Sequence, residues 1–268
     1  NYIACWDPVT SSWSALGLGL NRQVEALTVL DGKLYVAGDF SSAGGISAAQ
    51  VACWDPAMQT WSALGSGLDG LMRDLAIWDG KVCAAGSFSG MAGVNGASGP
   101  LACWDPATQT WSALGSGIIG AAQDIAVLDG KLYAGGSFHI LGEEDAKDIV
   151  CWDPATSSWS TTLAVSTASQ MMYALAVLDG KLYAGGCFLS VRGVLADCVA
   201  CLDPMTSTWS ALGSGMASLA SDVLALATLH GKLYAGGTFT TAGTEGTSHI
   251  ASWDPVSAAW SSLGSGVG

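Results

Sequence analysis

The sequence predicts an all-β protein made of short antiparallel strands, and three observations lead to this prediction. A block of the type Cys-Trp-Asp-Pro recurs about every 50 residues, a spacing typical of repeat proteins. Between these blocks stands a motif of the type Asp-Gly-Lys-Leu-Tyr, and Asp-Gly is the strongest short signal of a β-hairpin. No window shows a sustained helical period of about 3.6 residues, which excludes helical repeats. The blocks start at Cys5, Cys53, Cys103, Cys151, Cys201 and Ser252, and the hairpin motifs at Asp31, Asp79, Asp129, Asp179 and His230.

Each repeat contains four predicted strands, called a, b, c and d here in chain order. In one repeat, strand a covers 124–128, strand b covers 131–138, strand c covers 149–152 and strand d begins near Trp159. Asp-Gly forms the turn between strands a and b. Asp-Pro starts the turn between strands c and d, because proline presets φ and the aspartate side chain can accept backbone hydrogen bonds.

The predicted strands are apolar on both faces. In the first c strand, Ile3 and Cys5 point to one face, and Ala4 and Trp6 point to the other. A sheet with two apolar faces must be covered on both sides. Four-stranded sheets that repeat about every 50 residues and cover one another are the blades of a β-propeller. We therefore expect residues 1–268 to form one β-propeller domain, as a segment of a larger protein.

The number of half-repeats favours six blades, one of them incomplete in this segment. The chain contains five a–b hairpins and six c–d hairpins. The alternative is five blades plus an extra hairpin. Because an open ring exposes strand edges and apolar faces, we expect the sixth blade to be completed by chain outside this segment or by a neighbouring molecule, a form of self-assembly.

Composition excludes several classes of protein. The net charge is −13 with only nine basic residues, and there is no basic cluster to neutralise nucleic-acid phosphates. Hydrophobic residues make up 50% of the chain, which argues against disorder. No apolar run approaches the ~18 residues of a membrane-spanning segment, so we expect no membrane insertion.

At this level of detail the repeat resembles the kelch repeat. The kelch pattern has a glycine doublet that ends strand b, then an aromatic residue, Asp-Pro and a second tryptophan. Here these are Gly135-Gly136, Trp152, Asp153-Pro154 and Trp159. The run 239–243, Phe-Thr-Thr-Ala-Gly, is similar to kelch-like repeats of extracellular microbial and fungal cell-surface proteins. This resemblance implies a β-propeller in an extracellular or cell-surface setting.

The repeated tryptophans are interpreted as packing residues between blades, with sugar stacking as the alternative, because a buried ring covers a large apolar area. Trp78 differs, since it precedes an Asp-Gly turn where other repeats have Leu or Ile. We expect it to be partly exposed and list it as a candidate binding residue. The packing tryptophans are Trp6, Trp13, Trp54, Trp61, Trp104, Trp111, Trp152, Trp159, Trp209, Trp253 and Trp260.

Five cysteines occupy the same c-strand position, starting with Cys5, and are expected to be small buried hydrophobic residues. Neighbouring sheets pack about 10 Å apart, too far for disulfides between equivalent positions. Cys187 ends a b strand and Cys198 begins the following c strand, so in an oxidising compartment we predict a disulfide between them. Cys83 has no evident partner.

The d–a and b–c connections vary between repeats and lie on the same face of a propeller, where ligand-binding loops are expected. Glu25, Arg73, Asp74, Asp124 and Tyr173 are candidate polar binding residues near the entry to strand a, together with Trp78. One b–c connection is acidic and could bind Ca²⁺, the only cofactor considered, although a solvated acidic loop is the simpler interpretation. Its candidate ligands are Glu143, Glu144, Asp145 and Asp148.

No catalytic set is apparent, since the chain has only three histidines, and we expect no enzyme activity. The favoured function is a non-enzymatic interaction or structural module of an extracellular or cell-surface protein. It would bind a protein or a glycan through the variable connections. A propeller lectin with repeated sugar sites is the alternative, and a propeller enzyme is a weaker one.

Overall fold

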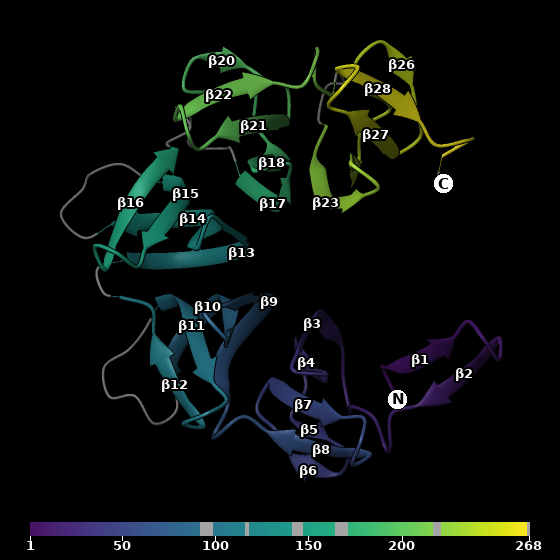
Figure 1. Ribbon diagram of the computed structural model, residues 1–268, viewed down its shortest axis with the longest axis vertical. Helices are drawn as coiled ribbons and strands as arrows, with labels where there is room; N and C mark the ends of the chain where they lie inside the picture. The colour runs from purple at the N-terminus through teal and green to yellow at the C-terminus, as the bar shows by residue number, and fades with distance from the viewer. Residues whose placement is uncertain (92–98, 116–117, 141–146, 164–170, 217–220, 267–268) are drawn as a thin grey trace. The chain divides into compact units, whose positions relative to one another are not determined.

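The computed structural model describes residues 1–268 except 92–98, 116–117, 141–146, 164–170, 217–220 and 267–268. All of the described strands belong to antiparallel sheets, among them five sheets of four strands (Figure 1). The chain divides into two compact units, Asn1–Ala122 and Gln123–Gly268, and each is described by itself. Whether the two form the single domain expected from the sequence stays a prediction.

The first unit contains the two-stranded hairpin β1–β2 and two four-stranded sheets, β3-β4-β7-β8 and β9-β10-β11-β12. A short ribbon, β5–β6, lies in the connection between strands b and c of the first sheet. The strands are β1 (Ala4–Asp7), β2 (Ser12–Ala15), β3 (Val24–Leu30), β4 (Lys33–Gly38), β5 (Ser42–Ala43), β6 (Ile46–Ser47), β7 (Val51–Asp55), β8 (Thr60–Ala63), β9 (Leu68–Trp78), β10 (Lys81–Met91), β11 (Gly99–Asp105) and β12 (Thr110–Ala113).

The second unit contains three four-stranded sheets, β13-β14-β15-β16, β17-β18-β21-β22 and β23-β24-β27-β28, with ribbons β19–β20 and β25–β26. The first strand of this set begins shortly before the unit boundary. The strands are β13 (Ile118–Leu128), β14 (Lys131–Ile140), β15 (Lys147–Asp153), β16 (Ser158–Leu163), β17 (Met171–Leu178), β18 (Lys181–Cys187), β19 (Ser190–Val191), β20 (Val194–Leu195), β21 (Val199–Asp203), β22 (Thr208–Ala211), β23 (Val223–Leu229), β24 (Lys232–Gly237), β25 (Thr241–Ala242), β26 (Glu245–Gly246), β27 (Ile250–Asp254) and β28 (Ala259–Ser262).

The predicted a–b turns form as expected from their sequence. Asp31 and Gly32 have φ values of 51° and 72°, the pair of positive values that a two-residue type I′ turn requires. Asp79, Asp129 and Asp179 repeat this conformation, and His230 adopts it where aspartate is replaced. Aspartate tolerates the left-handed region better than most residues, which explains why it recurs there.

The c–d turns form by the predicted side-chain mechanism. The Oδ1 atom of Asp55 accepts hydrogen bonds from the backbone N–H groups of Ala57, at 2.9 Å, and Met58, at 3.1 Å. Equivalent bonds occur at Asp7, Asp105, Asp153, Asp203 and Asp254. Each Asp-Pro aspartate therefore shapes its own turn.

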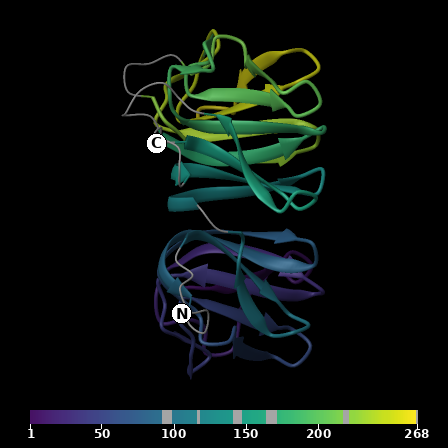
Figure 2. The same ribbon diagram turned by 90° about the vertical axis from the view of Figure 1, so that its left-hand side faces the viewer.

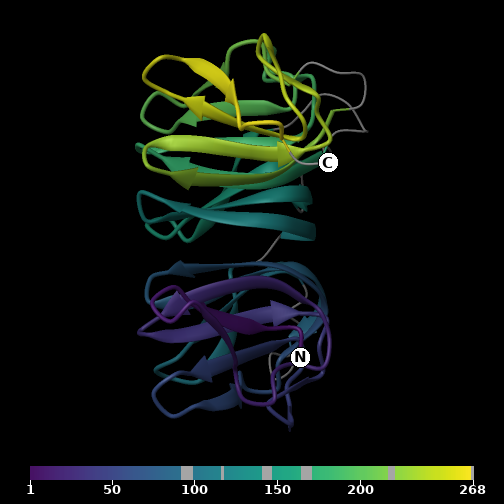
Figure 3. The same ribbon diagram turned by 90° about the vertical axis from the view of Figure 1, so that its right-hand side faces the viewer.

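The inner strands are buried on both faces, as their apolar pattern predicts. Val51, Ala52, Cys53 and Trp54 of β7 are all buried, with exposed fractions of 6% or less. Within each unit, the short hairpin turns lie at one edge of the sheets and the longer connections lie at the opposite edge (Figures 2 and 3). We call these the constant edge and the variable edge. The described residues contain no helix that is long and apolar enough to cross a membrane.

Candidate functional site

The c- and d-strand tryptophans form the joint between neighbouring sheets. Trp54 and Trp61 lie opposite each other in the β7–β8 register, with ring centroids 5.3 Å apart. The Trp61 indole Nε1–H donates a 2.8 Å hydrogen bond to the backbone carbonyl of Leu16, which follows strand β2. Gly17 lies against the same two rings, because a Cβ there would be 3.3 Å from Trp54. The end of one d strand thus docks on the tryptophan pair of the next sheet.

This joint repeats along the chain. Trp111 donates to the Leu64 carbonyl at 2.9 Å, and Trp260 donates to the Leu212 carbonyl at 2.9 Å. These rings are nearly buried, which supports the packing interpretation and leaves them little surface for stacking on a sugar. Three of the repeated tryptophans differ, because Trp6 is 45% exposed, Trp13 is 69% exposed and Trp159 is half-buried.

Trp78 is only 8% exposed, so the expectation of a partly exposed side chain was wrong. It occupies the last position of its a strand, where Leu128 and Leu178 are buried in other sheets. Because side chains alternate along a strand, the side chain at this position points to a face of the sheet that is covered, although the position is next to a turn.

A lysine and an aspartate form an ion pair at the constant edge of every four-stranded sheet. Lys33 at the start of β4 lies 3.1 Å from Asp55 at the end of β7. The hydrogen bond from Lys131 to Asp153, at 2.8 Å, lowers the pKa of that carboxyl group and raises the pKa of the lysine. The remaining pairs are Lys81–Asp105, Lys181–Asp203 and Lys232–Asp254.

Beside three of the five ion pairs, a b-strand tyrosine faces the c-strand cysteine. Tyr35 lies opposite Cys53 in the β4–β7 register, and burial, followed by the neighbouring Cys53, raises the pKa of Tyr35 to about 12. Burial also raises the pKa of the Cys53 thiol, in spite of its hydrogen bond with Tyr35. A thiol needs a lowered pKa to act as a nucleophile near neutral pH. This cysteine is therefore suited to packing and poorly suited to catalysis.

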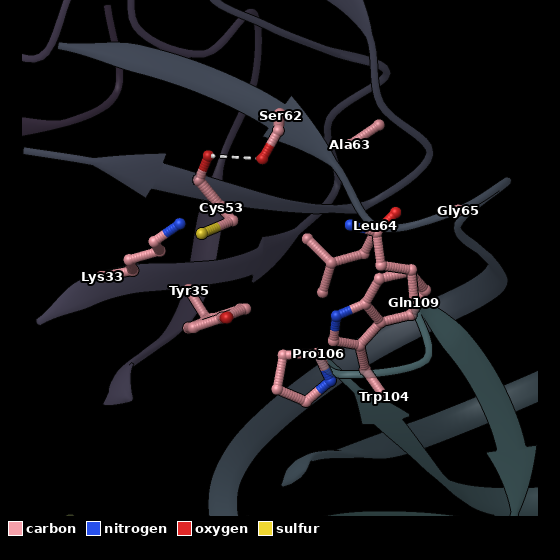
Figure 4. A pocket seen from close by; sticks show the side chains of 10 residues that line it. All are labelled: Lys33, Tyr35, Cys53, Ser62, Ala63, Leu64, Gly65, Trp104, Pro106 and Gln109. Atoms are coloured by element: carbon pink, nitrogen blue, oxygen red, sulfur yellow. Dashed lines mark hydrogen bonds between the residues drawn. The ribbon is translucent and has the colours of Figure 1, made fainter. Parts of the chain in front are cut away.

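A groove of about 260 Å³ opens next to this group, between the two four-stranded sheets of the first unit (Figure 4). The side chain of Ser62 closes one wall through a 3.5 Å hydrogen bond to the Cys53 carbonyl. The groove combines one cation, one phenol and a tryptophan edge, which suits a small polar group. It is lined by Lys33, Tyr35, Cys53, Ser62, Ala63, Leu64, Gly65, Trp104, Pro106 and Gln109.

The disulfide prediction was wrong in its choice of cysteines. Cys187 and Cys198 are free thiols, whereas Cys83 and Cys103 form a disulfide with an S–S distance of 2.00 Å. Cys198 lies just before its c strand, and its thiol turns to the Ser221 carbonyl at 3.0 Å.

The pairing of Cys83 follows from the strand register. Cys83 replaces the b-strand tyrosine, and that position lies directly across from the repeated c-strand cysteine, here Cys103. Spacing between blades does not limit this pair because both residues belong to one sheet. The sequence signal was available, since Cys83 breaks the tyrosine pattern at the one position that faces a cysteine.

The repeated cysteine position is buried wherever the sheet is complete. Cys53, Cys151 and Cys201 are 3–6% exposed, but Cys5 is exposed. The uniform burial expected for these five cysteines was therefore wrong at Cys5. The hairpin β1–β2 has no b strand beside it, so nothing covers this thiol in the described first unit.

The candidate polar residues near the entry to strand a lie in different sheets. Glu25 is exposed on β3, Arg73 is exposed on β9, and Asp74 beside it is half-buried. Tyr173 on β17 is half-buried, and burial, followed by the nearby charge of Asp222, raises its pKa.

Asp124 connects two neighbouring sheets of the second unit. Its carboxylate accepts hydrogen bonds from the backbone N–H groups of Ile125, at 2.8 Å, and Leu175, at 2.6 Å. These bonds join β13 to β17 and give Asp124 a structural role that sequence reasoning missed.

The predicted Ca²⁺ ligands Glu143, Glu144 and Asp145 lie outside the described residues. Asp148 is 7% exposed on β15. Elsewhere in the described parts of the chain, no group of three or more His, Cys, Asp or Glu side chains could hold a metal ion. The Ca²⁺ site stays a prediction.

Comparison with known families gives two matches and agrees with this architecture. Residues 9–131 match the model of the Rax2 C-terminal beta propeller domain. Residues 178–207 match the model of the Domain of unknown function (DUF5122) beta-propeller. No curated protein matches the chain. The repeated four-stranded sheets, the joints between them and both family matches identify the chain as a β-propeller.

Proposed function

We propose that the protein is a non-enzymatic interaction module that binds a protein or a glycan through its variable edge. The difference between the two edges of the sheets carries this proposal. At the constant edge, every complete sheet repeats the same two turns and the same lysine–aspartate pair. At the variable edge, connection 39–50 holds a β-ribbon, whereas β9 and β10 extend to 11 residues each in the next sheet. Variation confined to one edge of a rigid scaffold is the arrangement expected of a binding surface.

The charge of the variable edge favours a partner with a cationic surface. Glu25, Asp39 and Asp222 are at this edge, and acidic residues outnumber basic ones in the connections that form it. Arg22 and Asp39 offset each other in an exposed ion pair at 2.9 Å. The remaining acidic excess would steer a basic partner toward this face.

A lectin with one sugar site per blade has less support. Its aromatic platforms would be the repeated tryptophans, but Trp61, Trp111 and Trp260 use their ring N–H groups in the joints between sheets. An enzyme also has less support, since the cysteines that face tyrosines have raised pKa values.

We further propose an extracellular or cell-surface location. The Cys83–Cys103 disulfide supports it, because disulfides persist mainly in oxidising compartments. The resemblance to cell-surface kelch-like repeats points in the same direction.

A charge-matched pair of variants tests the binding edge. The first variant carries Glu25→Gln and Asp222→Asn at the variable edge, and the second carries Asp31→Asn and Asp179→Asn at the constant edge. Asparagine tolerates the positive φ of those turns, so both variants should fold, which circular dichroism would check.

Labelled wild-type protein would be applied to intact cells and to a glycan array. We expect binding that the first variant loses and the second keeps. Equal loss in both variants would show a nonspecific charge effect. Binding by neither the wild-type protein nor the variants would contradict the proposed function.

A further inference from the structure

The hairpin β1–β2 lacks the ion pair that every four-stranded sheet has. Asp7 is equivalent to Asp55, which is paired with Lys33 at 3.1 Å. Across the described residues, no lysine or arginine lies within 4.0 Å of the carboxylate of Asp7, a half-buried residue at the start of the c–d turn. The missing partner is the first residue of a b strand.

The same hairpin also lacks the tyrosine that covers the repeated cysteine. In the complete sheets, Tyr35 lies across from Cys53 and Tyr183 lies across from Cys201, and both cysteines are buried. Cys5 is exposed, and no strand in the described part of the chain pairs with the outer edge of β1. An unpaired strand edge is a template for a further strand.

An apolar groove lies where the missing strands would pack. A pocket of about 370 Å³ is lined by Cys5, Leu27 and Val29, among other residues. Leu27 is 54% exposed, whereas Leu75, its counterpart on the next a strand, is 6% exposed. The equivalent groove between the two four-stranded sheets of the first unit has a smaller volume, about 260 Å³. There, Lys33 and Tyr35 of strand b form one wall (Figure 4).

We propose that the outer edge of β1 and this groove form a docking site for one kind of partner, a β-hairpin of the a–b type. Its second strand begins Lys-x-Tyr and pairs antiparallel with β1, with the tyrosine opposite Cys5 and the lysine on Asp7. Its first strand presents apolar side chains to Leu27 and Val29. The register is that of β4 on β7, where Tyr35 pairs with Cys53. This site is separate from the variable edge, so its test does not depend on the proposed function.

The probe is a synthetic peptide with the sequence of residues 123–138, which contains an a–b turn and the adjoining parts of β13 and β14. The readout is the alkylation rate of Cys5 in the native protein, followed by peptide mapping. At a peptide concentration ten times the dissociation constant, mass action predicts that labelling slows about ten-fold. Cys187, which is outside the site, should label at an unchanged rate.

The specificity control uses charge. A peptide with Lys131→Glu should protect Cys5 much less than the wild-type peptide, because its glutamate faces Asp7. In protein carrying Asp7→Asn, which can keep the turn hydrogen bonds, the two peptides should protect Cys5 equally.

Three results would overturn the proposal. Cys5 could stay reactive at millimolar peptide, or both peptides could protect it equally in the wild-type protein. Alternatively, protection could rise with protein concentration when no peptide is present, which would assign the edge to a second copy of the chain.

Discussion

Replacing Trp111 by alanine should cost far more stability than the same replacement at Trp13, although both occupy the same d-strand position. Trp111 is 6% exposed, its ring centroid is 5.6 Å from that of Trp104, and its indole N–H is bonded to the Leu64 carbonyl. Trp13 has a similar ring partner in Trp6 at 5.3 Å but is 69% exposed. The comparison therefore isolates the joint between sheets from the cross-strand ring contact.

The magnitudes follow from these environments. Truncating a buried tryptophan to alanine costs about 3–5 kcal/mol, because packing is lost and a cavity is left. Trp13→Ala should lose mainly the contact between the two rings, worth about 0.5–1.5 kcal/mol. Trp111→Phe keeps most of the ring but removes one of the two donors to the Leu64 carbonyl, which still accepts the Gly67 N–H, so it should cost about 0.5–1.5 kcal/mol.

The assay is urea unfolding followed by circular dichroism, with hydrogen exchange of the peptides that contain β8 and β12. Exchange is needed because the two units could unfold separately, and a single unfolding free energy would then be ill-defined. The packing interpretation would be refuted if Trp13→Ala cost as much as Trp111→Ala. A Trp111→Ala protein with normal stability but weaker ligand binding would support the stacking role instead.

The remaining predictions concern three other contacts. Non-reducing peptide mapping should recover Cys83 joined to Cys103, and recovery of unlinked peptides would contradict the pairing. Replacing both cysteines by serine should destabilise the protein by about 3 kcal/mol, the value expected for a disulfide between residues 20 positions apart. Asp124→Ala should lower the unfolding free energy by about 1.5–3 kcal/mol, because the N–H of Leu175 loses a charged acceptor. Hydrogen exchange at the Leu175 amide should accelerate, and an unchanged exchange rate would show that the bond is unimportant. The folded pKa of Tyr35 is raised to about 12 from an ordinary value of 10.0, so its contribution to stability is complete below pH 10 and is lost as pH rises toward 12. Unfolding free energies measured from pH 8 to 12 should therefore fall less steeply for Tyr35→Phe, and identical slopes would refute this assignment.

Local features of the fold could be predicted from the sequence because their causes are local. Asp31-Gly32 requires only two residues that accept positive φ, and Asp55 shapes its turn with its own carboxylate. The period of about 50 residues then implied that each sheet covers the next. These observations were sufficient for strands, turns and fold class.

The candidate site was less predictable because its contacts join residues far apart in the chain. Asp124 looked like a residue free to bind a ligand, yet it accepts the N–H of Leu175, 51 residues away. The spacing of its neighbours in the sequence contains no sign of that contact. The variable edge could be located from strand alternation alone, but its side-chain arrangement could not.

The sequence by itself determined the repeat, the four-strand unit and the hairpin turns, since each depends on residues within one repeat. The recurrence of tryptophan at the same two positions also indicated its packing role. Only the tertiary structure decided which cysteines pair, that Trp78 is covered and that Cys5 is not. Those outcomes depend on the register across strands and on whether a neighbouring strand is present. A residue's own sequence context specifies which face it points to, but burial and bonding depend on what the fold places opposite that face.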